Sequence, residues 1–235
     1  MLQHNGLTGS IPSALTGLPN LEGLYLGDNQ LQGSIPGALA SLSKLTDLKL
    51  GGNQLTGGIP ASLGGMASLE RLYLQKNQLD GPLPPELGNL GSLKTLWLEN
   101  NQLSGVLPAE WGKLRNLTDL DLENNRITGI SPQIADEPGE LGSLQKLNLD
   151  NNDLQGTIPA TLGNLTALQY LTLADNPHLT GPIPPQLGQL NSLRVLRLYN
   201  DNLTGPIPPQ LGNLKKNWST LISATTGWRE RSRPN

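Results

Sequence analysis

The chain has 235 residues, a formal net charge of −3 and a hydrophobic content of 36%. It has no cysteine, which excludes disulfide bonds and thiolate metal sites, and its two histidines are too few for a histidine-rich metal site. The weakly acidic balance provides no basic field for nucleic acid, and no window of about 20 apolar residues predicts a membrane-spanning helix.

One motif, L-x-L-x-x-N-x-L-x-G-x-[IL]-P, recurs along nearly the whole chain. Its asparagine falls at Asn5, Asn29, Asn53, Asn77, Asn101, Asn125, Asn152 and Asn176, and Asp201 takes the ninth place. Successive positions are 24 residues apart, except for 27 after Asn125 and 25 after Asn176. A period of this length indicates a solenoid in which each repeat forms one coil.

Each repeat predicts the same series of elements, which the third one illustrates. Residues 48–50 (LKL) alternate apolar and polar side chains, which predicts a short strand with Lys49 facing outward. Asn53 follows at the bend, where its amide can satisfy backbone groups that the turn leaves unpaired. Residues 57–60 predict an extended segment, and the apolar residues of 61–69 complete the coil at roughly helical spacing. We therefore expect a ladder of structural asparagines at Asn29, Asn53, Asn77, Asn101, Asn125, Asn152 and Asn176.

Short segments within the repeats carry a family resemblance. They are LTGSIP (7–12), LQGSIP (31–36), LTGGIP (55–60), LQGTIP (154–159) and LTGPIP (179–184 and 203–208), with LGNL at 87–90, 162–165 and 211–214. Over about residues 2–214 the chain resembles the plant-type leucine-rich repeat family, as in receptor-like kinase ectodomains and polygalacturonase-inhibiting proteins. The resemblance implies an α/β-type solenoid. This is a right-handed leucine-rich repeat superhelix with parallel strands on the concave face and 3-10 or irregular segments on the convex side.

The same resemblance implies an extracellular location, although this chain lacks the signal peptide and the paired-cysteine caps usual in the family. Residues 1–214 are expected to form about nine repeats, the first one truncated, and residues 215–235 a C-terminal cap or a basic tail that docks an acidic partner. The first coil would leave an apolar face uncovered, which predicts possible self-association. Three extra residues around 135–140 are interpreted as a tolerated bulge, with an acidic contact loop as the alternative.

Outward-facing strand positions are where a repeat protein is free to vary. All four tyrosines and Trp97 fall there, and acidic residues gather in the middle of the array, on strands expected to lie about 4.8 Å apart. Exposed tyrosine and tryptophan anchor interfaces, although strand propensity also explains them. The candidate partner-binding residues are Tyr25, Tyr73, Trp97, Glu99, Asp119, Asp121, Glu123, Asp150, Tyr170, Arg197 and Tyr199.

These positions predict a non-catalytic recognition module that binds a protein, peptide or oligosaccharide on the concave face, without a cofactor. The alternative is a structural spacer with no specific ligand, its acids forming a solvated face. A second alternative has Glu99, Asp119, Asp121 and Glu123 holding Ca²⁺ through oxygen ligands. An enzyme is disfavoured, because a carboxylate pair such as Asp121 and Glu123 needs an enclosed pocket, which an open sheet does not provide.

Overall fold

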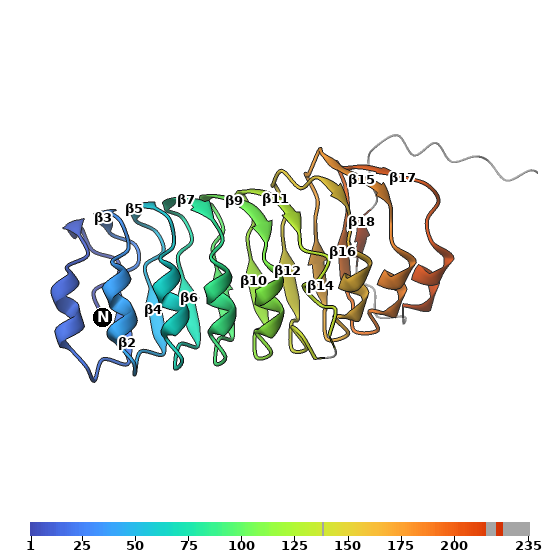
Figure 1. Cartoon of the computed structure of the whole chain (residues 1–235). Helices are drawn as coiled ribbons and strands as arrows, with labels where there is room; N and C mark the ends of the chain where they lie inside the picture. The colour runs from blue at the N-terminus through green and yellow to red at the C-terminus, as the bar shows by residue number, and fades with distance from the viewer. Residues whose placement is uncertain (138, 215–219, 223–235) are drawn as a thin grey trace, which may run out of the picture.

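The computed structural model describes residues 1–137, 139–214 and 220–222. The chain forms an elongated solenoid of stacked coils (Figure 1). Each regular coil runs from a strand of one sheet, round a tight bend, into a strand at the side and then into a 3-10 helix. This order is the one that the repeat motif predicts. The leucine-rich repeat fold with parallel strands is therefore confirmed.

A nine-stranded parallel sheet lines the concave face. Its strands are β2 (Gly23–Tyr25), β4 (Asp47–Lys49), β6 (Arg71–Tyr73), β8 (Thr95–Trp97), β10 (Asp119–Asp121), β12 (Lys146–Asn148), β14 (Tyr170–Thr172), β16 (Val195–Arg197) and β18 (Thr220–Ile222). Strands of successive coils pair in register, so that Leu48 lies beside Leu24 and Leu72. Side chains alternate across a strand, which places these leucines in the core and their neighbours on the outer face.

Shorter parallel sheets form the side of the solenoid. One contains β1 (Thr8–Ser10), β3 (Gln30–Gly33), β5 (Gln54–Gly57), β7 (Gln78–Pro82), β9 (Gln102–Leu107) and β11 (Arg126–Ile130). The other contains β13 (Gly156–Thr157), β15 (Leu179–Pro182) and β17 (Asn202–Thr204). The glycine of each L-x-G triplet is required here, since Gly57 has a φ of 74° and only glycine adopts that region without strain. The sequence predicted extended segments here without predicting that they pair.

The convex side carries 3-10 helices, as the family resemblance implies. They are η1 (Ser13–Gly17), η2 (Gly37–Ser41), η3 (Ala61–Gly65), η4 (Pro85–Asn89), η5 (Ala109–Lys113), η6 (Ala160–Asn164), η7 (Pro185–Gln189) and η8 (Pro209–Asn213). A proline precedes each one, and its φ near −65° suits a helix start. The described residues of the 27-residue coil form turns where a 3-10 helix would lie. Its insertion is thus accommodated away from the concave face.

Leucine side chains fill the interior of the stack. The inward leucines of successive coils, such as Leu48, Leu72 and Leu96, have 0% exposure. Trp111 replaces the leucine of η5, is also 0% exposed, and donates its indole N–H to the carbonyl of Pro84 at 2.9 Å. At the N-terminal end Leu2 and Leu7 remain 53% and 38% exposed. The expectation of self-association through this first coil remains a prediction.

The asparagine ladder ties each coil to the one before it. The side-chain carbonyl of Asn53 accepts the backbone N–H of Leu31 at 3.0 Å. Its amide donates to the carbonyls of Leu26, Leu50 and Gly51 at 3.0, 2.9 and 3.4 Å. The same four-bond pattern recurs in the other ladder positions, Asn29, Asn77, Asn101, Asn125, Asn152 and Asn176.

Asp201 ends the ladder with a carboxyl group in place of the amide. It is 1% exposed, and its Oδ1 accepts the backbone N–H of Asn176 at 2.9 Å. Its Oδ2 is buried without a hydrogen-bond partner in the described part of the chain. Burial raises the pKa of Asp201 to about 7, and the nearby charges of Asp175 and Asp150 raise it further. Since no donor faces this second oxygen, an ionised carboxylate fits the site poorly.

Replacing Asp201 with asparagine is expected to stabilise the fold in a pH-dependent way. The pKa in the folded chain, about 7, lies above the reference value of 3.8. The wild type therefore loses stability as the pH rises from about 4 through 7, and keeps this loss above 7. At pH 8 the variant should gain about 1–3 kcal/mol, the typical cost of one unsatisfied buried group. The gain should shrink toward pH 4.5.

Urea unfolding at pH 4.5, 6 and 8 measures this difference, with Asp80→Asn on the exposed side sheet as the matched control. An equal gain at pH 4.5 and pH 8 would contradict the assignment of Asp201 as the titrating group. No gain at pH 8 would show that the carboxylate is accommodated.

Of the predicted tail at 215–235, only the backbone of β18 lies within the described residues. This strand pairs with β16 and extends the concave sheet by one strand. The choice between a cap and a partner-binding tail otherwise lies outside the described residues.

Candidate recognition surface on the concave sheet

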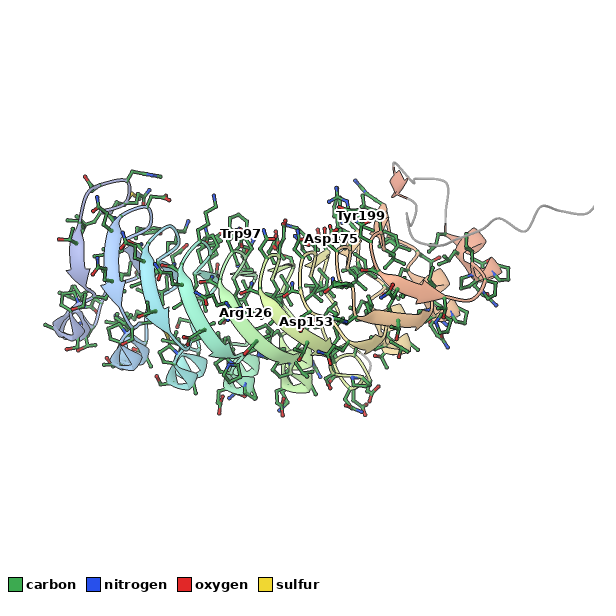
Figure 2. All side chains as sticks on the ribbon, turned by 90° about the horizontal axis from the view of Figure 1, so that it is seen from above. Trp97, Arg126, Asp153, Asp175 and Tyr199 are labelled. Carbon is green, nitrogen blue, oxygen red and sulfur yellow. The ribbon has the colours of Figure 1, made fainter. Side chains whose placement is uncertain are left out.

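All eleven predicted partner-binding residues lie on, or directly after, strands of the concave sheet. Seven are strand residues, and the other four, Glu99, Glu123, Asp150 and Tyr199, lie two residues beyond a strand end. Figure 2 shows Trp97 and Tyr199 along the inward-curving edge of the solenoid, whereas Arg126 and Asp153 lie on its side. The strand register thus gathers residues far apart in sequence onto one surface.

An aromatic row, defined as Tyr25, Lys49, Tyr73 and Trp97, crosses four neighbouring strands in register. The ammonium group of Lys49 lies 5.3 Å from the ring centre of Tyr25 and 4.7 Å from that of Tyr73. The rings of Tyr73 and Trp97 are 4.7 Å apart between centres and tilted by 55°. These distances are typical of cation–π and aromatic pairs. The row is therefore a continuous and partly buried platform.

The acidic group, defined as Glu99, Asp119, Asp121, Glu123 and Asp150, follows the aromatic row. Lys146 lies among its members, with Nζ 2.7 Å from Asp121 and 3.9 Å from Asp119. Sequence reasoning placed Lys146 on the outer face but did not include it in the site. Its register partner in β10 could have shown the pairing, since Asp119 and Lys146 lie directly side by side.

Asn148 organises the next part of the acidic group. Its amide donates to Asp121 at 3.1 Å and to Glu123 at 3.0 Å. The Thr172 hydroxyl and the Asp150 backbone N–H both donate to its carbonyl, at 2.6 and 3.1 Å. The bond from Asn148 helps to hold the buried Asp121 carboxylate, which is 7% exposed. The Asp150 carboxylate, which is 6% exposed, instead accepts the backbone N–H of Ala174 at 2.8 Å. Sequence reasoning missed this role of Asn148.

Polar atoms without partners gather where the aromatic row meets the acidic group. In the described part of the chain, Trp97 Nε1, Glu99 Oε2 and Asp119 Oδ1 are shielded from solvent and have no partner at ideal hydrogen-bond geometry, although the Trp97 indole lies close enough to Asp119 to lower the pKa of its carboxyl group. Gln75 Oε1 and Arg197 Nε, also on this face, share this property. Each such atom costs about 1–3 kcal/mol relative to a satisfied one. Of the unpartnered buried side-chain atoms in the described chain, only Asp201 Oδ2 lies elsewhere.

Burial also changes the acidity of this surface. It raises the pKa of Glu99 to about 7, and the neighbouring Asp121 adds to this. It raises the pKa of Asp150 to about 6. Burial raises the pKa of Asp119 as well, and Lys146 and the nearby Trp97 indole lower it only in part. Glu99 and Asp150 therefore ionise near neutral pH, and a cation placed beside them would favour the ionised form.

The structure does not bring every predicted residue into one cluster. Tyr170 is 40% exposed on β14, three strands from Trp97, a distance of about 14 Å. Arg197 lies near Asp150, with Nη1 3.8 Å from Oδ2, and Tyr199 follows β16. These residues form the C-terminal margin of the surface, apart from the aromatic row.

No group of acidic, histidine or cysteine residues in the described ranges could hold a metal ion, so the calcium alternative has no support. None of the helices within the described chain is long and apolar enough to cross a membrane.

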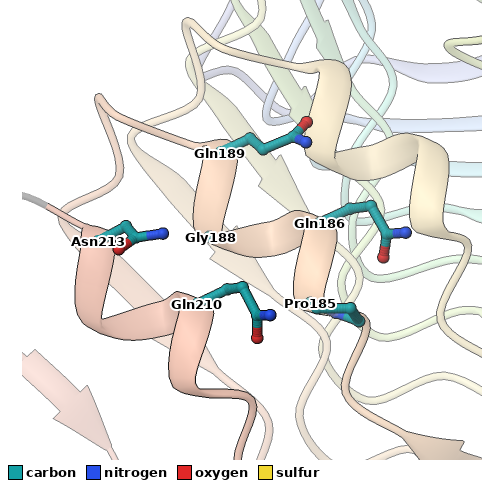
Figure 3. Close-up of a pocket in the computed structure, with 6 residues that line it drawn as sticks. All are labelled: Pro185, Gln186, Gly188, Gln189, Gln210 and Asn213. Carbon is teal, nitrogen blue, oxygen red and sulfur yellow. The ribbon is translucent and has the colours of Figure 1, made fainter.

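Two hollows within the described residues lie away from the concave sheet. One of about 250 Å³ lies between η7 and η8 (Figure 3). It is lined by Pro185, Gln186, Gly188, Gln189, Gln210 and Asn213. Because none of these side chains titrates, this hollow offers no general acid or base. A larger groove on the flank has mostly apolar walls, among them Pro82, Pro84 and Val106.

The fold and this surface define the class of the protein, a parallel-β solenoid that presents an open, chemically varied sheet. The model of the leucine-rich repeat region matches residues 83–216, and that of the leucine-rich repeat matches residues 1–55 and 36–79. The chain belongs to the leucine-rich repeat family and is of the plant type. No relative is found among the curated proteins.

Solved structures show what the chain is similar to. One is the ectodomain of the Arabidopsis thaliana receptor kinase GASSHO1/SCHENGEN3 in complex with CASPARIAN STRIP INTEGRITY FACTOR 2, with 39% identity, a TM-score of 0.83, and coverage of 92% of this chain and 26% of that chain. Another is the Arabidopsis HAESA ectodomain with an IDA peptide hormone, with 36% identity, a TM-score of 0.72, and coverage of 90% and 39%.

A leucine-rich repeat protein of Leptospira interrogans is similar too, with 33% identity, a TM-score of 0.78, and coverage of 92% of this chain and 52% of that chain. The chain thus spans less than two thirds of the length of each of these proteins.

Proposed function

We propose that this chain is a non-catalytic recognition module that binds a protein, peptide or oligosaccharide on the concave sheet, with a peptide favoured. The observation that carries the proposal is the aromatic row beside the acidic group, with unpartnered polar atoms where they meet. A surface that served only as a spacer would gain nothing from leaving these atoms unsatisfied. The similar HAESA ectodomain in complex with a peptide hormone supports the choice of a peptide.

Two described carboxylates of the concave sheet support the non-catalytic part of the proposal. Asp121 is held by Lys146 and Asn148, and Glu123 shares the Asn148 amide. Both carboxylates lie on an open sheet, where bulk water competes with any reacting group.

We also propose an extracellular location, which the similarity to receptor ectodomains supports.

The double variant Trp97→Ala/Asp121→Ala is expected to weaken partner binding at least tenfold, because buried aromatic anchors commonly contribute 2 kcal/mol or more, about a 30-fold change. Peptide and glycan arrays probed with the wild type and the variant measure this effect. The control is Asp80→Ala/Val106→Ala on the side sheet, where both residues are exposed. If the control loses binding and the concave variant retains it, the site lies on the flank. If the wild type binds nothing, the spacer alternative gains support.

A further inference from the structure

Three asparagines of the described chain, Asn116, Asn164 and Asn202, each begin an Asn-Leu-Thr string, and all three are exposed. A fourth acceptor string, at 217–219, lies outside the described residues. Asparagine followed two residues later by threonine is the acceptor for N-linked glycans in secreted proteins. The repeat template itself favours asparagine followed by leucine, so the surroundings of each amide in the fold have to decide which strings can be modified.

The ladder asparagines differ from these three in both sequence and surroundings. None of the ladder residues from Asn29 to Asn176 is exposed, and none has serine or threonine two residues later. The amide of a ladder residue such as Asn53 donates to three carbonyls and so uses both of its hydrogens. The fold therefore separates asparagines that hold the coils together from asparagines that are open to modification.

The amides of Asn116 and Asn164 each make one bond to the preceding coil within the described residues. Asn116 donates to the carbonyl of Gly91 at 2.8 Å, and Asn164 donates to the carbonyl of Ala135 at 2.8 Å. A primary amide has two hydrogens, so one remains on each exposed side chain. A glycosylated amide keeps one N–H, and the bond to the neighbouring coil can therefore persist after modification.

Both residues lie on one edge of the solenoid, the turn edge, which consists of the turns that lead from each 3-10 helix to the next concave strand. Asn116 lies in the turn between η5 and β10, and Asn164 is the last residue of η6, ahead of β14. The turn edge is opposite the side sheets (Figure 1). Asn202 differs, because Asn202 and Thr204 belong to β17 of a side sheet and pair there with β15.

We propose that Asn116 and Asn164 carry N-linked glycans, which cover the turn edge and leave the concave sheet open. The inference rests on the extracellular location proposed above. The donor is a polyprenyl pyrophosphate-linked oligosaccharide of the secretory pathway. Nδ2 of the asparagine forms a bond to the anomeric carbon of N-acetylglucosamine and loses one proton, while the bond from that carbon to the pyrophosphate oxygen breaks. The polyprenyl pyrophosphate is the leaving group, and nothing is oxidised or reduced.

The test uses the full chain isolated from its own source. Treatment with peptide-N-glycosidase A in ¹⁸O-water releases N-linked glycans and leaves ¹⁸O-labelled aspartate at each former acceptor, which mass spectrometry of peptides locates. We expect the label at both Asn116 and Asn164. The matched control is Asn89, which is exposed and ends η4 as Asn164 ends η6, but has Gly91 where the threonine would be. Absence of the label at Asn116 or Asn164, or an equal label at Asn89, overturns the proposal.

Substitutions of Thr118 test the acceptor string without changing the asparagine. The full chain is expressed behind a cleavable secretion signal in eukaryotic cells. Thr118→Ser keeps a hydroxyl that can donate to the carbonyl of Lys94, as threonine does at 2.9 Å, and should keep the glycan at Asn116. Thr118→Val lacks the hydroxyl, so the glycan at Asn116 should be lost and the one at Asn164 retained. A glycan at Asn116 in the valine variant would contradict the assignment, and circular dichroism verifies the fold of both variants.

The position of the glycans predicts how they affect recognition. Because the turn edge is separate from the outer face of the concave sheet, enzymatic removal of both glycans from the folded chain should leave its array binding unchanged. Loss of binding after this treatment would show that the glycans belong to the binding surface, and would contradict the proposal that they leave it open.

Failure of this inference can be distinguished from failure of the proposed recognition function. If the chain carries no glycan at Asn116 and Asn164 but loses array binding on Trp97→Ala/Asp121→Ala, this inference fails and the concave recognition surface stands. If both glycans are present in a chain that binds nothing on the arrays, this inference and the extracellular location stand while the recognition function fails.

Discussion

Replacing Asn176 with alanine is expected to lower the free energy of unfolding by about 3–5 kcal/mol, because several buried backbone groups lose their partners at once. Asn176 is 0% exposed. It accepts the N–H of Leu154 at 3.0 Å and donates to the carbonyls of Leu149, Leu173 and Ala174 at 3.1, 2.7 and 3.1 Å. Alanine replaces none of these bonds, and the site is closed to bulk solvent.

Urea unfolding followed by circular dichroism measures the loss. The control is Asn191→Ala, an exposed asparagine whose amide donates to Gln189 within its own turn, and this change should cost less than about 0.5 kcal/mol. Equal losses for the two variants would show that the ladder contributes no more than ordinary surface bonds. Because coils contact mainly their neighbours, a broadened transition would indicate that only the C-terminal part has unfolded.

Trp111→Ala is expected to destabilise the chain by a similar amount, about 3–5 kcal/mol, through loss of apolar contact and the cavity that remains. Trp111 is the largest of the fully buried side chains in the described residues. Its removal also leaves the carbonyl of Pro84 without the indole donor. Hydrogen exchange should show the loss centred on η4 and η5, which are neighbouring coils.

Trp111→Leu separates the two contributions, since leucine occupies the same position in other coils, as Leu63 and Leu87 do. It keeps an apolar side chain, so its loss of stability should be clearly smaller than that of alanine. If alanine and leucine destabilise equally, the indole hydrogen bond matters more than packing. A neutral effect of both changes would contradict the packing argument.

The 24-residue period allowed most of the fold to be predicted. Because a period fixes which residues share a position in successive coils, it placed Leu48 inside, Lys49 outside and Asn53 at the bend. It could not predict that the L-x-G segments pair into side sheets, since pairing depends on how closely the coils stack. It also gave Asp201 the ninth place in the series, but it did not predict that a carboxyl group, which cannot donate as an amide does, would be buried there.

The candidate surface was predicted as a set of positions but not as a network of interactions. Alternation along each strand identified the outward residues, including Trp97 and Glu99. The burial of Asp121 and Asp150, the ion pair of Lys146 and the central role of Asn148 depend on side-chain rotamers across neighbouring strands. A linear pattern contains no information about those rotamers, because the contacts join residues 24 to 27 positions apart.

The spacing of the concave strands differs from the residue spacing of an extended ligand that runs along the solenoid, so the two coincide only at intervals. Strands advance by about 4.8 Å per coil, whereas an extended peptide advances by about 3.3 Å per residue. Two coils therefore match three ligand residues to within about 0.3 Å. A peptide with one residue placed over Trp97 would present its residues three positions away over the strands two coils distant. The ligand side chains between them would not align with a strand, so the contact residues of a recognised sequence should repeat every three positions.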